Sequence, residues 1–171
     1  MRHFLFFIVF GLLAASVSAA KPSHAPVQSA VVNLAPDFAI SGVPGKGRTL
    51  RSLRGQSVVL LFAKSVKTTD LKREVKYLQE LYEQFASKET IFAVAFREGD
   101  ALIPSNIPFV IVSNGAAVNA AYGVQKDFSI AIIGKDGNLD YITTKVLPPE
   151  RVRDVIQNSF PVQDALRKKD R

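Results

Sequence analysis

The feature that most constrains this chain is a strand, loop, helix and strand pattern in its middle third. An uninterrupted apolar run, Val58 to Phe62, precedes a short polar loop, Lys64 to Asp70, and a second apolar run spans Ile91 to Phe96. Such runs are typical of strands that are covered on both faces. Between them, apolar residues recur at helical spacing: Leu71, Val75, Leu78, Leu81, Tyr82 and Phe85. The pattern predicts a β-α-β unit with parallel strands and a right-handed crossover.

Shorter patterns extend this unit on both sides. Phe38 and Ile40 alternate with polar or small neighbours, and a glycine-rich turn at 42–47 returns the chain through Thr49, which predicts an N-terminal hairpin. Asp37 is expected to fix a turn there. Downstream, the sequence predicts a strand at Phe109 to Val112, a helix at Ala116 to Tyr122 ended by Gly123, antiparallel strands at Phe128 to Ile133 and Leu139 to Thr144, and a helix from Pro148 and Pro149 to near Ser159.

The first twenty residues have the pattern of a secretory signal peptide. Arg2 precedes an apolar segment, Phe4 to Leu13, and small residues predict cleavage after Ala19 or Ala20. The apolar segment is shorter than the roughly 20 residues that a membrane-spanning helix needs. The expected parts are a signal peptide at 1–20, a linker at 21–31, one domain at 32–160 and a basic tail at 161–171. We therefore expect an exported chain, periplasmic or secreted.

Residue types exclude several kinds of chemistry. The 171 residues contain no cysteine, so the chain offers no disulfide, thiolate metal ligand or thiol nucleophile. Of the two histidines, His3 lies in the signal peptide and His24 in the linker. A histidine relay or histidine metal centre is therefore not expected in the domain, and the sequence predicts neither a metal nor a cofactor.

The chain is basic, with a formal net charge of +7. The basic residues cluster at Lys46, Arg48, Arg51 and Arg54, at Lys64, Lys67, Lys72, Arg73 and Lys76, and at Arg167, Lys168, Lys169 and Arg171. Such clusters are typical of a solvated surface, or they attract anionic envelope lipids or acidic partners. Nucleic acid is not an expected partner, because basic and aromatic residues are not interleaved in a recognised pattern.

Five short pieces, in order, carry a resemblance to a known family. They are Ala35-Pro36-Asp37-Phe38, Leu53-Arg54-Gly55 before the first run, Leu78-Gln79-Glu80-Leu81-Tyr82, Ala121-Tyr122-Gly123-Val124 and Ile133-Gly134-Lys135-Asp136-Gly137. Over residues 32 to 159 the chain resembles the thioredoxin-like redoxin superfamily of AhpC/TSA peroxiredoxins and thiol-disulfide oxidoreductases. The resemblance implies a three-layer α/β fold, with a central mixed sheet, flanking helices and an N-terminal β-hairpin extension.

The resemblance also locates the family's reactive positions. The active-site loop and the helix after it match Lys67, Thr68, Thr69, Asp70, Leu71 and Glu74. Two registers remain open: one places Lys67 at the family's nucleophilic cysteine, and the other places Thr68 and Leu71 at a Cys-x-x-Cys pair. Neither register supplies a thiol. The family's cis-proline matches Phe128, which Ser129 follows.

Ordinary structural roles are expected at most of these positions. Lys67 is interpreted as an exposed loop lysine, Thr68, Thr69 or Asp70 as helix caps, and Glu74 as an ordinary helix residue. Residues 136–140 are interpreted as a hairpin turn, because their spacing does not fit a calcium loop. The 42–47 segment likewise lacks the features of a dinucleotide-binding turn.

The leading hypothesis is a non-catalytic protein-binding or chaperone-like module that uses the Lys64–Asp70 loop with Phe128 and Ser129. Its partner would be a protein or peptide. One alternative is an antioxidant or oxidoreductase, as the resemblance implies. Another is a protein that binds the anionic envelope surface. The sequence does not predict an oligomeric state.

Overall fold

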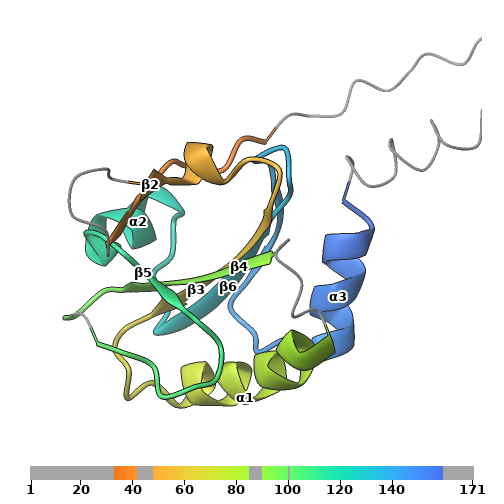
Figure 1. Ribbon diagram of the computed structural model, residues 1–171. Helices are drawn as coiled ribbons and strands as arrows, with labels where there is room; N and C mark the ends of the chain where they lie inside the picture. The colour runs from red at the N-terminus through yellow and green to blue at the C-terminus, as the bar shows by residue number, and fades with distance from the viewer. Residues whose placement is uncertain (1–32, 42–47, 85–89, 100, 160–171) are drawn as a thin grey trace, which may run out of the picture. The chain divides into compact units, whose positions relative to one another are not determined.

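The computed structural model describes residues 33–41, 48–84, 90–99 and 101–159 (Figure 1). The strands are β1 (Ala39–Ser41), β2 (Arg48–Thr49), β3 (Ser57–Ala63), β4 (Thr90–Phe96), β5 (Val110–Val112), β6 (Phe128–Ile133) and β7 (Leu139–Thr143). The helices are the 3-10 helix η1 (Leu50–Leu53) and the α-helices α1 (Thr69–Gln84), α2 (Gly115–Ala121) and α3 (Pro149–Gln157). The predicted signal peptide, linker, 42–47 turn, Phe85 and basic tail lie outside the described residues.

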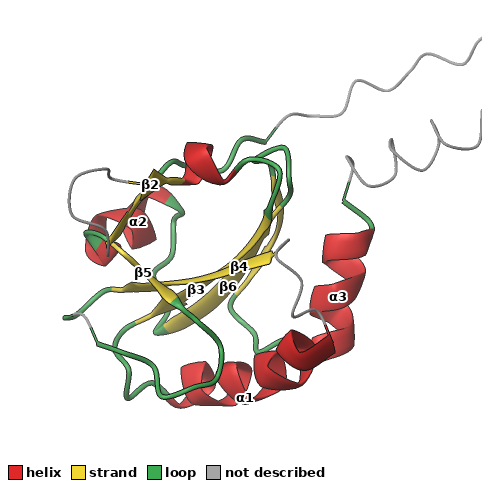
Figure 2. Cartoon of the chain, viewed as in Figure 1, coloured by secondary structure: helices red, strands yellow, loops and turns green. Residues whose placement is uncertain are grey.

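All seven strands belong to one mixed sheet in the order β2-β1-β5-β4-β3-β6-β7. β3 runs parallel to β4 and antiparallel to β6, and β6 pairs antiparallel with β7. β1 and β2 form the predicted N-terminal hairpin. Helices α1 and α3 cover one face of the sheet, whereas α2 and η1 lie on the other (Figures 1 and 2). The predicted three-layer α/β architecture is therefore confirmed.

The central strand β3 contributes to both hydrophobic cores. Val59 and Leu61 pack on the face covered by α1 and α3, whereas Leu60 and Phe62 pack toward α2. Every residue of β3 is buried, as the continuous apolar run predicted. Burying a large aliphatic or aromatic side chain stabilises a fold by about 2 kcal/mol. The apolar run therefore places β3 at the centre of the domain.

Helix α1 packs through the predicted apolar face. Leu71, Leu78 and Leu81 are each at most 1% exposed. The helix begins at Thr69, two residues before the first of these apolar positions. None of the described helices is long and apolar enough to cross a bilayer.

Helix α2 lies unusually close to β4. A Cβ added to Gly115 would lie only 2.1 Å from the Phe96 carbonyl oxygen, so this position requires glycine. The buried Asn119 side chain donates hydrogen bonds to the carbonyl oxygens of Ala95, at 3.2 Å, and of Gly115, at 2.8 Å. After the helix, Gly123 has a φ of 67°, the left-handed conformation predicted for the residue that ends a helix.

Candidate functional site

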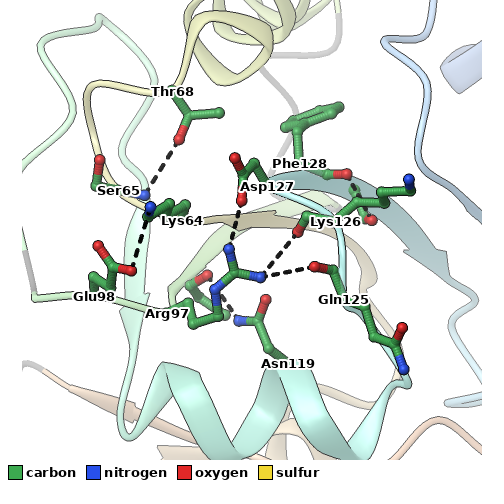
Figure 3. A network of polar contacts seen from close by, with 12 residues as sticks. Lys64, Ser65, Thr68, Arg97, Glu98, Asn119, Gln125, Lys126, Asp127 and Phe128 are labelled. Atoms are coloured by element: carbon green, nitrogen blue, oxygen red, sulfur yellow. Dashed lines mark hydrogen bonds and ion pairs between the residues drawn. The ribbon is translucent and has the colours of Figure 1, made fainter.

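The Lys64–Asp70 loop connects the carboxyl end of β3 to α1. The Ser65 N–H donates to the Thr68 hydroxyl at 3.2 Å, and the Thr68 N–H donates to the Ser65 carbonyl at 3.1 Å (Figure 3). The Thr68 carbonyl then accepts from the Lys72 N–H in the first turn of α1. Thr68 therefore lies directly before the helix, but its hydroxyl accepts from the Ser65 N–H of the loop, so its predicted role as a side-chain cap stays a prediction.

The positions that match the family's reactive residues differ in exposure. The Lys67 side chain is exposed, Thr68 is half-buried, and Leu71 is only 1% exposed. Thr69 and Asp70 are exposed in the first turn of α1, where Asp70 forms a 4.0 Å ion pair with Arg73. Because none of these side chains carries sulfur, both registers lack a thiol. The assignment of one register over the other stays a prediction.

Glu74 differs from the ordinary helix residue that was expected. Its side chain is 0% exposed. One carboxylate oxygen, Oε2, accepts a 2.7 Å hydrogen bond from the Leu147 N–H, while Oε1 has no hydrogen-bond partner among the described residues. Burial raises the pKa of Glu74 to about 7, and the hydrogen bond from Leu147 opposes that shift.

The spacing of the neighbouring apolar residues contains the signal for this burial. Glu74 lies three residues after Leu71 and four before Leu78, so it shares their helical face. A carboxylate on that face must pack under the chain that covers α1. Glu74 is therefore a buried acid beneath the 144–148 segment, not a solvent-facing one.

Phe128 and Ser129, which match the family's cis-proline region, lie in the sheet and not on the surface. Phe128 is 3% exposed and Ser129 is 1% exposed. Phe128 pairs with Ala63 and Ser129 with Phe62 in the antiparallel ladder between β6 and β3. No cis peptide bond occurs within the described ranges. Both residues nevertheless line surface hollows, Phe128 one of about 520 Å³ that Asp70 also lines and Ser129 one of about 360 Å³ that Tyr122 also lines, so their contribution to a contact surface beside the loop stays a prediction.

Arg97 holds the chain that leads into β6. Its guanidinium donates to the carbonyl oxygens of Gln125, at 3.0 Å, and Lys126, at 3.3 Å, and it pairs with the Asp127 carboxylate (Figure 3). The Lys64 N–H also donates to the Asp127 carbonyl at 2.9 Å. Planar guanidinium groups suit such multiple contacts. Arg97 therefore fixes the backbone of residues 125–127 on the β6 side of the site.

The contacts of Arg97 were not predicted from the sequence. Arg97 directly follows the β4 run, and Asp127 directly precedes the β6 run. The carboxyl end of β4 and the start of β6 meet at one edge of the sheet. Opposite charges at these two positions are therefore the sequence signal for an ion pair between Arg97 and Asp127. Lys64 and Glu98 lie beside them and form a 3.7 Å ion pair.

A groove runs along the other side of the site, beside α1. It has a volume of about 330 Å³. We refer to it as the α1 groove, and it is lined by Val66, Lys67, Leu71, Lys72, Val75, Lys76, Gln79, Ile103 and Pro104. The sequence placed the lysines in a basic cluster but gave no indication that the 101–108 segment would form the opposite wall.

Two further predicted motifs have structural roles. The Asp37 carboxylate accepts hydrogen bonds from the N–H groups of Phe38 and Arg51 and pairs with the Arg51 side chain at 3.4 Å, as expected for a residue that fixes a turn. The Tyr122 hydroxyl donates to the Pro36 carbonyl at 2.8 Å, which joins two of the five motif pieces. Burial raises the pKa of Tyr122, with the Asp37 charge adding to the shift.

The predicted hairpin turn joins β6 to β7 at residues 134–138, and the last two residues of the 136–140 segment already belong to β7. The Asp136 carboxylate accepts hydrogen bonds from the backbone N–H of Asn138 at 3.0 Å and from its side-chain amide at 2.6 Å. Burial, helped by the nearby Asp136 charge, raises the pKa of Asp140 to about 6. Within the described ranges, no three acidic, histidine or cysteine side chains are grouped so that they could hold a metal ion.

Comparison with known proteins agrees with this architecture. The structure is similar to a thiol:disulfide interchange protein of the thioredoxin family from Chlorobium tepidum, at 14% identity and a TM-score of 0.57 over 75% of this chain and 96% of that one. It is also similar to the exposed lipoprotein thioredoxin of Streptococcus pneumoniae, at 19% identity and a TM-score of 0.53 over 70% and 98% of the two chains.

A third similar structure is the bacterioferritin comigratory protein of Xanthomonas campestris, which was studied for alkyl peroxide reduction. It has 21% identity and a TM-score of 0.55 over 74% of this chain and 92% of that one. These likenesses show a thioredoxin-like fold. No curated protein matches the sequence. The AhpC/TSA family profile matches residues 31–142, which is more than half of the sequence. The chain, although it contains no cysteine, therefore belongs to the AhpC/TSA family.

Proposed function

We propose that this chain is an exported, non-catalytic member of its family that acts by binding a protein or peptide. The single observation that carries this proposal is a complete thioredoxin-like scaffold with no thiol at the reactive positions. Peroxide reduction and disulfide exchange by this family need a thiolate nucleophile. Lys67, Thr68 and Leu71 cannot supply one in either register.

Export rests on separate support. The pattern of Arg2, the apolar segment and the small residues before Lys21 is typical of a signal peptide. One similar structure is described as an exposed lipoprotein. Expression of the full chain in a Gram-negative host, followed by fractionation and N-terminal sequencing, should yield a periplasmic product that begins at Ala20 or Lys21. An intact cytoplasmic product would contradict export.

The binding role is tested by crosslinking in cells. A photoreactive side chain replaces the exposed Lys67, which the structure places in the loop before α1 without burying it. The expected result is a small set of discrete crosslinked species from the full chain expressed in its native cells. The absence of any discrete species would contradict a binding function at this loop.

The oxidoreductase alternative is supported by family membership and is tested with the purified chain. We expect the purified chain to reduce neither hydrogen peroxide nor an organic peroxide, and not to reduce insulin disulfides with dithiothreitol, above the rate of a heat-denatured sample. Turnover above that rate would overturn the non-catalytic proposal, because it would demonstrate a mechanism that needs no cysteine.

A further inference from the structure

We propose that the α1 groove is a docking site for a short acidic, amphipathic peptide segment of a partner protein. This inference deepens the proposed binding function and depends on it. It adds two things that the function alone does not specify: the surface that is used and the chemistry of the segment that occupies it.

The walls and floor of the groove are apolar. Leu71 and Val75 of α1 form buried parts of its lining, whereas Val66 and Ile103 remain half-buried and Pro104 is exposed. These side chains offer apolar surface that a partner would remove from water. The occupant therefore needs aliphatic or aromatic side chains on one of its faces.

The 101–104 segment, which forms one wall of the groove, also carries an exposed apolar side chain. Leu102, next to Ile103 in the chain, is 85% exposed, the largest exposure among the big apolar side chains of the described residues. A single exposed leucine is common, and Leu102 does not line the groove, so the apolar contact is assigned to the lining residues alone.

The rim of the groove is basic. Lys67, Lys72 and Lys76 line it with exposed side chains, and the lining contains no carboxylate. Among the described residues, none of these three ammonium groups has an ion-pair partner within 4.0 Å. Lys72 and Lys76 are four residues apart on α1, a spacing at which like charges repel each other. A carboxylate that binds between them would relieve this repulsion, so charge complementarity selects an acidic segment.

The length of the groove indicates the size of the occupant. From Leu71 to Gln79 the helix rises about 12 Å, which corresponds to roughly two turns of a second helix. Amphipathic helices that dock in apolar grooves use anchors at positions i, i+3, i+4 and i+7. A segment with leucines at those positions and glutamates beside them matches both the apolar surface and the rim.

The test uses a synthetic, fluorescently labelled 14-residue peptide with leucines at i, i+3, i+4 and i+7 and glutamates at most other positions. Binding to the mature chain is followed by fluorescence anisotropy at two salt concentrations. A second peptide carries lysine at every glutamate position, and a third carries serine at every leucine position. We expect only the first peptide to bind, and we expect its affinity to fall as salt rises.

Two matched chain variants locate the site. Lys72→Glu/Lys76→Glu reverses two charges at the groove, whereas Lys126→Glu/Lys145→Glu makes the same change in net charge at exposed positions that do not line it. The groove variant should weaken peptide binding at least tenfold, and the control variant less than twofold. Equal losses in the two variants, or no binding by the acidic peptide to the wild-type chain, would overturn the proposal.

Two more arms separate the alternatives. Ile103→Ser, with its melting temperature checked, should also weaken peptide binding. Unchanged affinity in a folded variant would contradict an apolar contact at Ile103.

Anionic vesicles test a lipid surface as the alternative occupant. If the wild-type chain binds the vesicles and not the peptide, and the groove variant loses vesicle binding, the rim binds lipid and the peptide proposal is wrong. If crosslinks from position 67 persist in Lys72→Glu/Lys76→Glu, the groove inference is wrong while the binding function survives.

Discussion

The two sides of the candidate site use their side chains in opposite ways. On the β6 side, Phe128 and Ser129 are buried, and Arg97 donates hydrogen bonds to the carbonyl oxygens of residues 125 and 126, which precede them. On the α1 side, Lys72 and Lys76 are exposed beside a groove of about 330 Å³. Arg97 thus satisfies backbone carbonyl groups on the β6 side, whereas the lysine ammonium groups on the α1 side have no ion-pair partner among the described residues.

This difference is the reason why we propose the α1 side as the part of the site that binds a partner. Occupied carbonyl groups and buried side chains on the β6 side contribute to the stability of the sheet. Exposed ammonium groups and partly buried apolar groups on the α1 side contribute little to folding and can contribute to association. Substitutions on the two sides should therefore separate effects on stability from effects on binding.

The largest expected effect is that of Phe128→Ala. Because Phe128 is 3% exposed within the core between β6 and α1, its truncation should lower the free energy of unfolding by about 3–5 kcal/mol. Urea denaturation followed by circular dichroism measures this change. Lys126→Ala, two residues earlier and exposed, serves as the control and should change stability by less than about 0.5 kcal/mol. A small effect at Phe128 would contradict its structural role.

Glu74 gives the next largest effect, and it depends on pH. The folded pKa is about 7, whereas the usual value is 4.5, so between these values the folded chain keeps a proton that the unfolded chain has lost. The free energy of unfolding should therefore fall as pH rises from 4.5 through 7, by roughly 3 kcal/mol in total.

Glu74→Gln tests this pH dependence. The amide keeps an oxygen that can accept from the Leu147 N–H but does not ionise. As pH rises from 4.5 through 7, the free energy of unfolding of the variant should fall less than that of the wild type. At pH 8 the variant should be the more stable of the two proteins. Asp140, whose pKa is raised to about 6, should cause a smaller fall in the free energy of unfolding with rising pH in both the wild type and the variant. Parallel profiles for the two proteins would show that Glu74 does not titrate in this range.

Arg97→Ala should have an intermediate effect. The substitution leaves the carbonyl groups of Gln125 and Lys126 without their guanidinium donor and removes the ion pair with Asp127. Hydrogen bonds that involve a charged group contribute about 1.5–3 kcal/mol when buried, and the partial exposure of Arg97 places the expected loss near 1–2 kcal/mol. Amide hydrogen exchange at 125–129 should also accelerate. Arg97→Lys keeps the charge and should restore less than the full stability, since an ammonium lacks the planar fork.

The smallest expected effect on stability belongs to Lys72→Glu/Lys76→Glu. Both side chains are exposed and have no ion-pair partner among the described residues, so the free energy of unfolding should change by less than about 0.5 kcal/mol. Thermal unfolding measures this value in the preparation used for peptide binding. A large loss of stability would show that the rim lysines hold the fold, and it would remove the contrast with the β6 side.

Most of the fold was predictable because its elements have local signals. The apolar run of β3, the helical spacing in α1, the left-handed Gly123 and the turn at 136–140 each depend on residues close together in the chain. Their order was enough to indicate the family and the three-layer architecture. Element boundaries shifted by one or two residues, as at Thr69 and Val110.

The candidate site was less predictable because it depends on contacts between distant segments. Leu147 covers Glu74, Arg97 reaches the chain before β6, and Ile103 and Pro104 face α1 across the groove. None of these pairs is close in sequence. The burial of Glu74 was not predicted, although its spacing from Leu71 and Leu78 places it on the apolar face of α1 and was a local signal for it. The positions carried over from the family lie at the carboxyl end of β3, in the first turns of α1 and at the start of β6, but the sequence did not indicate which of their side chains are exposed.

The most direct test of this account is paired photocrosslinking in native cells, with the reactive side chain at position 67 in one chain and at position 126 in the other. Both positions are exposed, and they lie on the α1 side and the β6 side, respectively. We expect discrete partner crosslinks from position 67 that disappear in the Lys72→Glu/Lys76→Glu background, and only weak, unspecific products from position 126. Equal partner sets from the two positions, or a set obtained only from position 126, would contradict the assignment of binding to the α1 side.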